Sequence, residues 1–294
     1  MDYQADLRNL KQDHEFFIGI DSDGCVFDSM EVKQKKFFIP NALRYFDLYS
    51  VSGILTETWE FVNLYSIYRG GNRFTSIIKV FELLQERIEI SDDNIKLPDL
   101  TSLKEWVMNE TKLGNANLLR FFESHYNNDL EKVVNWTEAV NRDISSQLRN
   151  IPPFPNAAST IKKLSNLADM VIVSQTPLEA LEREWEEHDL KKYVNAIAAQ
   201  EHGTKTEHIS LAAKGKYSDS KILMIGDAKG DLEAAIKNGI HFYPVIPGKE
   251  DHSWERFINE GLEKFTKGIY NGKYEEGLIK EFEESLPEVP PWKR

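Results

Sequence analysis

Five short apolar segments constrain the fold more than any other feature of this 294-residue chain. They are FFIGID (16–21), MVIVSQ (170–175), VNAIAA (194–199), KILMIGD (221–227) and HFYPVI (241–246). Short segments that are apolar at nearly every position, and are bounded by polar or turn residues, are typical of strands buried on both faces. Helical periods separate the later segments; Leu178, Leu181 and Trp185, for example, share one face. This alternation predicts an α/β fold built on a parallel, doubly wound sheet.

The stretch 30–149 has a different pattern, because it contains helical periods and no convincing strand. Phe74, Ile77, Phe81 and Leu84 form one apolar stripe of this kind. We therefore expect an all-helical cap, or lid, domain at 30–149, inserted into a core made of residues 1–29 and 150–248. The tail at 249–294 is helical again until LPEVPPW, and we expect it to pack on the core as a C-terminal extension.

The composition excludes several classes of function. The chain has 36 basic and 48 acidic residues, a net charge of −12, which argues against a nucleic-acid binder but allows a small anionic substrate. Cys25 is the single cysteine, so an internal disulfide is impossible. No apolar run approaches the roughly 20 residues of a membrane-spanning helix, and the N-terminus lacks signal-peptide features. We expect a cytoplasmic monomer or homodimer that binds neither nucleic acid nor membrane.

Carboxylates follow two of the predicted strands. Asp21 and Asp23 come after the first strand, and Asp227 and Asp231 come after the fourth. Sites in parallel sheets lie at the carboxyl ends of the strands, so these side chains converge if the two strands are neighbours. A buried cluster of carboxylates is tolerable only with a divalent cation among it. Oxygen ligands without a spare cysteine favour Mg²⁺ over zinc, and Mg²⁺ is the expected cofactor.

Four motifs together resemble the haloacid dehalogenase-like hydrolase superfamily. They are DSDGCVFDS (21–29), VIVSQTP (171–177), EHGTKTEHI (201–209) and IGDAKGDLEAA (225–235). They occur in the family's order, each at a predicted strand end or helix start. The helical insertion after the first motif is similar to the phosphoglycolate phosphatase and β-phosphoglucomutase-like branch. The resemblance implies a Rossmann-like sheet with strand order 3-2-1-4-5. Cys25 is a departure, because threonine is commonest at its position.

The resemblance also implies a catalytic role for several residues. Asp21 would be the nucleophile that forms an aspartyl-phosphate, and Asp23 would be the general acid and then the general base. Ser174 would donate a hydrogen bond to a phosphoryl oxygen, and Gln175 beside it is a further candidate substrate contact. Lys205 would hold the nucleophile and offset charge in the transition state.

The same resemblance implies a set of metal ligands. Asp227 would bind Mg²⁺ together with an oxygen of Asp21 and the backbone carbonyl of Asp23. Asp231 would act at longer range or through water. Plain structural alternatives remain for two of the candidates: Ser174 could cap the end of its strand, and Asp231 could complement a helix dipole.

Basic residues in the helical insertion are candidate substrate contacts. YRGGNRF (68–74) resembles the short Gly-x-x-Arg cap loop of the β-phosphoglucomutase-like branch, which makes Arg73 a candidate for binding an anionic group. A turn between helices with solvated arginines is the alternative. Lys33, Lys35 and Lys36 form either a substrate funnel or a solvated helix face.

These observations predict Mg²⁺-dependent hydrolysis of a phosphate monoester, with a small phosphorylated metabolite as substrate. A phosphomutase acting on a sugar phosphate, or a phosphonate hydrolase, is the alternative within the same resemblance. Dehalogenation is disfavoured, because that chemistry needs neither an acid at Asp23 nor a metal. A non-catalytic binding module is disfavoured too, because the nucleophile and the metal carboxylates are all present.

Overall fold

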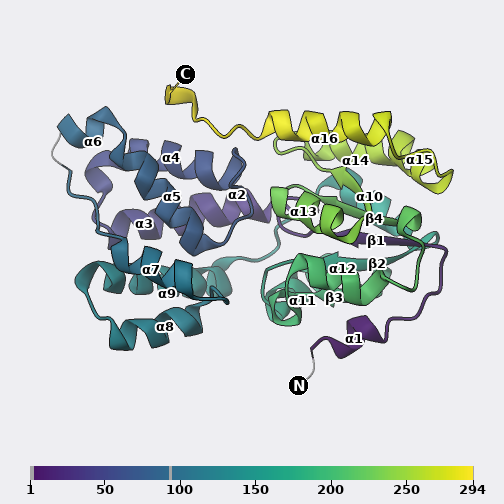
Figure 1. Cartoon of the computed structure of the whole chain (residues 1–294), viewed down its shortest axis with the longest axis horizontal. Helices are drawn as coiled ribbons and strands as arrows, with labels where there is room; N and C mark the ends of the chain where they lie inside the picture. Colours follow the sequence, from purple (N-terminus) through teal and green to yellow (C-terminus); the bar gives the residue numbers. More distant parts are fainter. Residues whose placement is uncertain (1–2, 93–94, 294) are drawn as a thin grey trace. The chain divides into compact units, whose positions relative to one another are not determined.

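Five parallel strands form one sheet in the computed structural model, which describes residues 3–92 and 95–293 (Figure 1). The strands are β1 (Phe16–Ile20), β2 (Ala168–Val173), β3 (Ala196–Ala198), β4 (Ile222–Gly226) and β5 (His241–Pro244). Their order is β3-β2-β1-β4-β5, and each neighbouring pair is parallel. The predicted strand order is therefore confirmed. It places the end of β1 between the ends of β2 and β4.

Helices cover both faces of the sheet, because alternate residues of each buried strand point to opposite sides. Helix α10 (Pro155–Leu164) precedes β2, whereas α11 (Leu178–Glu187), α12 (Lys205–Ala213) and α13 (Lys229–Asn238) follow β2, β3 and β4. Short elements complete this part: α1 (Ala5–Arg8), η3 (Lys191–Tyr193), η4 (Gln200–His202) and η5 (Asp219–Lys221). Helices α12 and α13 pack against each other, with α12 over β2 and α13 over β4 and β5.

The C-terminal extension supplies much of the layer on the other face. It contains α14 (Glu250–Arg256), the π-helical turn η6 (Phe257–Gly261), α15 (Leu262–Thr266) and α16 (Lys273–Ser285). Trp254 and Phe257 are fully buried in the same apolar cluster as Ile18 and Ile225 of the sheet. The indole Nε1 of Trp254 also donates a hydrogen bond to the carbonyl oxygen of Cys25, at 2.8 Å. The extension thus holds the loop that follows β1.

The chain divides into two compact units. The sheet unit comprises residues 3–30 and 149–287, and the helical unit comprises residues 31–148 and 288–293. The sequence had assigned all of 249–294 to the core, whereas the closing residues belong to the helical unit. The reason is Trp292, whose ring lies 5.4 Å from that of Phe61 and 4.5 Å from the guanidinium carbon of Arg87.

The helical unit contains no strand among its described residues. Its first part contains α2 (Ser29–Lys33, starting in the sheet unit), the π-helical turn η1 (Gln34–Phe38), α3 (Ile39–Tyr45), η2 (Tyr49–Val51), α4 (Ser52–Leu64) and α5 (Arg73–Gln85). Its second part contains α6 (Ile88–Asp92), α7 (Thr101–Asn109), α8 (Asn115–Ser124), α9 (Asn128–Gln147) and η7 (Pro291–Lys293). In the described part of either unit, none of the helices has the length and apolar character needed to cross a bilayer.

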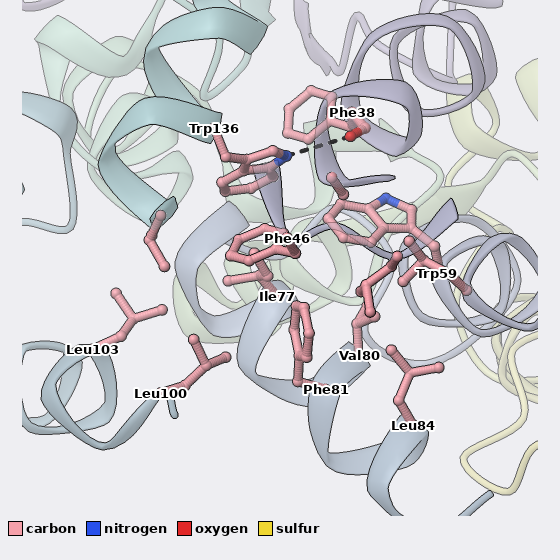
Figure 2. Close-up of a cluster of buried hydrophobic side chains, with 14 of the residues drawn as sticks. Phe38, Phe46, Trp59, Ile77, Val80, Phe81, Leu84, Leu100, Leu103 and Trp136 are labelled. Carbon is pink, nitrogen blue, oxygen red and sulfur yellow. Dashed lines mark hydrogen bonds between the residues drawn. The ribbon is translucent and has the colours of Figure 1, made fainter. Parts of the chain in front are cut away.

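Two tryptophans lie at the centre of the helical unit, as Figure 2 shows. The rings of Trp59 from α4 and Trp136 from α9 meet edge to face, with their centroids 5.8 Å apart. The indole Nε1 of Trp136 donates to the carbonyl oxygen of Phe38 at 3.3 Å, and the two rings also pack edge to face. The stripe predicted along α5, which includes Phe74 and Ile77, is buried against this centre. The helical unit therefore has its own apolar core.

Replacing Trp136 by alanine should destabilise the helical unit by about 3–5 kcal/mol, because it leaves a large cavity and removes an indole hydrogen bond. The measurement is urea unfolding followed by circular dichroism. Met108→Ala is the control, since Met108 is 84% exposed in the same unit and should change the free energy by less than about 0.5 kcal/mol. Equal effects of the two substitutions would contradict the central position of Trp136.

Candidate active site

The end of β1 brings Asp21 to the point where three strands end. The backbone N–H of Asp21 donates to the carbonyl oxygen of Ile225 in β4 at 2.9 Å, which continues the parallel ladder to the last residue before the turn. The chain then turns at Gly24, whose φ of 79° is a left-handed conformation that glycine adopts without strain. Asp21 and Asp23 both precede this turn, and their side chains have different partners.

Asp21, Asp227 and Asp231 form one buried carboxylate cluster. Each offers an oxygen, and these oxygens all lie within 4.8 Å of one another. The ammonium group of Lys205 lies 3.0 Å from Oδ2 of Asp21 and 2.6 Å from Oδ1 of Asp231. Asp227 and Asp231 are fully buried, and Asp21 is 4% exposed. The structure therefore brings together four of the residues that the motifs identified.

Local structure fixes the lysine and one of the aspartates. Lys205 is the first residue of α12, after Thr204, which caps the helix by accepting from the N–H of Glu207. Asp231 lies in the first turn of α13 and accepts from the N–H of Ala228 at 3.1 Å. Gly226 makes room for it, since a Cβ there would lie 2.4 Å from Cγ of Asp231. The glycine and the aspartate of the fourth motif are thus sterically coupled.

Burial dominates the electrostatics of this cluster. Desolvation raises the pKa of Asp21 to about 7, although the ammonium of Lys205 opposes the shift. Desolvation, with the charge of Asp21 as the next cause, likewise raises the pKa of Asp231 to about 7. Burial would lower the pKa of Lys205, but the carboxylates of Asp21 and Asp231 outweigh it and raise that pKa well above its ordinary value. Lys205 therefore remains a cation, and one ammonium balances several carboxyl groups only in part.

The donor set fits a hard divalent cation. The cluster supplies oxygen ligands alone, held close together in a buried site, as Mg²⁺ prefers. A cation there would also stabilise the ionised forms of these carboxyl groups, whose pKa values burial raises. The ligands available to it are the carboxylates of Asp21, Asp227 and Asp231.

Asp23 stands apart from this cluster, and two hydroxyl groups engage its carboxylate. Oδ2 of Asp23 accepts from Oγ1 of Thr176 at 2.6 Å, and Oδ1 accepts from Oγ of Ser29. Thr176 follows β2, and Ser29 is the first residue of α2. Asp23 is not among the residues whose carboxylate oxygens gather around the possible cation position. The two aspartates of the first motif therefore occupy different environments.

The second motif lies at the end of β2, as expected. The N–H of Ser174 donates to the carbonyl oxygen of Ala198 at 2.9 Å, and its Oγ accepts from the N–H of Thr176 at 3.2 Å. The oxygen accepts this N–H through a lone pair, so the hydrogen of the hydroxyl group can still be donated to another acceptor. The amide of Gln175 donates to the carbonyl oxygen of Gly203 at 2.9 Å and thereby links this turn to the loop before α12.

Two of the basic candidates of the insertion, Arg73 and Lys35, have partners within the helical unit. The guanidinium of Arg73 donates to Oγ1 of Thr137 at 3.0 Å and to Oδ1 of Asn141 at 2.6 Å, and it lies 5.1 Å from the ring of Phe38. Lys35 forms an ion pair with Glu31 at 2.7 Å. A role of these side chains in substrate binding stays a prediction.

Sequence reasoning missed the hydroxyl partners of Asp23. It assigned neither Ser29 nor Thr176 a contact with Asp23. The available signal was a second hydroxyl residue two positions after Ser174, within the turn SQTP. Cys25, the departure from the first motif, is fully buried in the apolar cluster of the sheet unit.

The chain is similar to known proteins in part of its sequence and in its fold. Residues 101–245 match a family described as haloacid dehalogenase-like hydrolase. A putative haloacid dehalogenase-like hydrolase from Bacteroides fragilis has the same fold, with a TM-score of 0.50 and 14% identity over 82% of this chain and 93% of that one. A predicted phosphoglycolate phosphatase from Haemophilus somnus 129PT gives a TM-score of 0.48 and 14% identity, over 79% of this chain and 84% of that one. No curated protein matches the chain.

The raised pKa of Asp231 predicts a pH dependence of stability in metal-free buffer. Between about pH 4 and pH 7 the folded state keeps a proton that the unfolded state has released, so the free energy of unfolding falls as the pH rises. Asp231→Asn lacks this titration. Wild type should therefore lose at least about 1 kcal/mol relative to Asp231→Asn between pH 5 and pH 8, since one pKa unit corresponds to about 1.4 kcal/mol.

Urea unfolding at several pH values, with a chelator present, measures this difference. A difference between the two proteins that stays constant across the range would show that Asp231 does not titrate there.

Proposed function

We propose that this chain is a haloacid dehalogenase-like hydrolase and that it hydrolyses a small-molecule phosphate monoester with Mg²⁺ as cofactor. The observation that carries the proposal is the separation of the two aspartates of the first motif. Asp21 lies against Lys205 in the carboxylate cluster, whereas Asp23 is held by hydroxyl groups outside it. One carboxylate is thus suited to attack phosphorus and the other to exchange a proton. The substrate would be a small phosphorylated metabolite of the cytoplasm. The protein would act as a monomer or a homodimer.

In the first step, a carboxylate oxygen of Asp21 attacks the phosphorus atom and forms an aspartyl-phosphate. The bond between phosphorus and the ester oxygen breaks, and Asp23 gives its proton to that oxygen, so that an alcohol leaves. Asp21 must be ionised to attack, and burial opposes this by raising its pKa to about 7. Lys205 favours the ionised form, because its ammonium lies 3.0 Å from Asp21.

In the second step, the carboxylate of Asp23 takes a proton from water while the water oxygen attacks the phosphorus of the intermediate. The bond to Asp21 breaks, which regenerates its carboxylate and frees inorganic phosphate. Asp23 is again protonated at the end, ready for the next ester. The acid and the base are therefore the same residue acting in opposite directions.

The remaining residues stabilise charge on the transferring group. Ser174 would donate its hydroxyl hydrogen to a phosphoryl oxygen, since its own oxygen already accepts from Thr176. Lys205 would offset negative charge as it develops. Asp21, Asp227 and Asp231 would hold the Mg²⁺, which when bound supplies positive charge to the phosphoryl oxygens. Gln175 and Arg73 remain candidate substrate contacts.

Purified protein should release phosphate from p-nitrophenyl phosphate when Mg²⁺ is added, and Asp21→Asn should lower kcat at least about 10³-fold, because the variant lacks the nucleophile. Asp189→Asn is the matched control, since this exposed aspartate of the sheet unit forms a surface salt bridge with Lys192. Activity that survives in Asp21→Asn, or that persists with a chelator, would contradict the proposal.

Metal binding can be measured without turnover. Calorimetric titration should show Mg²⁺ binding to wild type and at least about 10-fold weaker binding to Asp227→Asn, because one oxygen ligand loses its charge. The control is again Asp189→Asn, which should bind like wild type. Equal affinity of wild type and Asp227→Asn would place the cation elsewhere.

A further inference from the structure

The hydroxyl group of Thr176 contacts Asp23, the proposed acid and base, and this contact has no role in the mechanism proposed above. Its Oγ1 lies 2.6 Å from Oδ2 of Asp23, across 153 positions of sequence. A hydroxyl group has one hydrogen to donate, and an aspartate oxygen at this distance is a strong acceptor for it. Asp23 follows β1 and Thr176 follows β2, so this hydrogen bond joins the ends of two neighbouring strands.

The backbone around Thr176 holds its hydroxyl in place. The N–H of Thr176 donates to Oγ of Ser174 at 3.2 Å, and its carbonyl oxygen accepts from the N–H of Gln200 at 3.2 Å. Pro177 follows and restricts the backbone further. Thr176 is therefore fixed from two sides, by the turn after β2 and by the segment after β3. A residue anchored in this way can orient the carboxyl group that its hydroxyl contacts.

The side chain of Asp23 needs such orientation. The nearby cluster of Asp21, Asp227 and Asp231 is where a cation would bind, and a cation attracts any free carboxylate. A carboxylate drawn into that cluster would become a metal ligand and could not exchange protons. Thr176 and Ser29 each hold one oxygen of Asp23 outside the cluster. Ser29 lies six residues after Asp23 in the same segment, whereas Thr176 lies in the turn that follows β2.

We propose that Thr176 is a positioning residue, which holds the carboxyl group of Asp23 where it can pass a proton to the leaving oxygen and take one from water. This inference rests on the proposed function and assigns a role that the four motifs do not contain. Its consequence depends on the leaving group. An alkoxide needs the proton of Asp23 to leave, whereas p-nitrophenolate is stable enough to leave without it.

The experiment compares kcat/KM for two esters, p-nitrophenyl phosphate and glycerol 2-phosphate, an alkyl monoester. For each ester this ratio reports the steps up to the first irreversible one, in which Asp23 acts as the acid. Thr176→Val should lower kcat/KM for the alkyl ester about 10–100-fold, within the range that general acid catalysis contributes. For p-nitrophenyl phosphate we expect a change of less than about 3-fold. Thr176→Ser keeps the hydroxyl and should restore the alkyl ester to within about 3-fold of wild type.

Thr160→Val is the matched control. Thr160 is fully buried in α10 of the sheet unit, and its Oγ1 has no hydrogen-bond partner, so removing the hydroxyl should leave both kcat/KM values unchanged. Circular dichroism and Mg²⁺ titration check that each variant is folded and binds metal. If the valine variant does not fold, Thr176→Ala takes its place in the same comparison.

The outcomes separate this inference from the proposed function. Equal losses for the two esters in Thr176→Val, or no loss for either, would overturn the role of Thr176 while wild type remains a phosphatase. A failure of Thr176→Ser to restore the alkyl ester would overturn it as well. A wild-type chain that releases phosphate from neither ester would overturn the proposed function, and the role of Thr176 with it.

Discussion

The ammonium group of Lys205 makes the arrangement at the strand ends possible. Carboxyl groups from the ends of β1 and β4 are buried together there, and burial alone would favour their neutral forms. Lys205 contacts Asp21 and Asp231 at once, and so ties the start of α12 to the end of β1 and to the first turn of α13. One ammonium group therefore links these three elements and favours the ionised form of Asp21.

This charge balance explains why the first motif carries two aspartates in different surroundings. Asp21 belongs to a buried cluster of carboxyl groups, in which desolvation raises the pKa values and whose oxygens are compatible with a divalent cation. Asp23 is surrounded instead by hydroxyl donors, which hold a carboxylate without neutralising it. Only Ser22 separates the two aspartates in the sequence, so their different surroundings come from their side-chain partners. Strand topology brings Asp21 to the carboxylates that follow β4.

Much of the fold and of the cluster was predictable from the sequence, because strand length, apolar pattern and motif position determine which strand ends meet. The contact of Lys205 with Asp21 follows from such placement. The hydroxyl of Thr176 was not predictable, since its direction depends on the turn after β2. Nor were the partners of Arg73, since Thr137 and Asn141 lie more than 60 positions away, on a helix whose register is set only by packing.

The last residues of the chain determine which fragments of this protein contain a complete helical unit. Helix α16 ends in the sheet unit, whereas Trp292 lies against Phe61 and Arg87 of the helical unit, so the chain passes between the two units three times. A fragment that ends at residue 148 would lack the indole that covers these two side chains. A fusion partner or affinity tag at the C-terminus would likewise be attached to the helical unit. Its linker would have to preserve the contacts of Trp292 with Phe61 and Arg87.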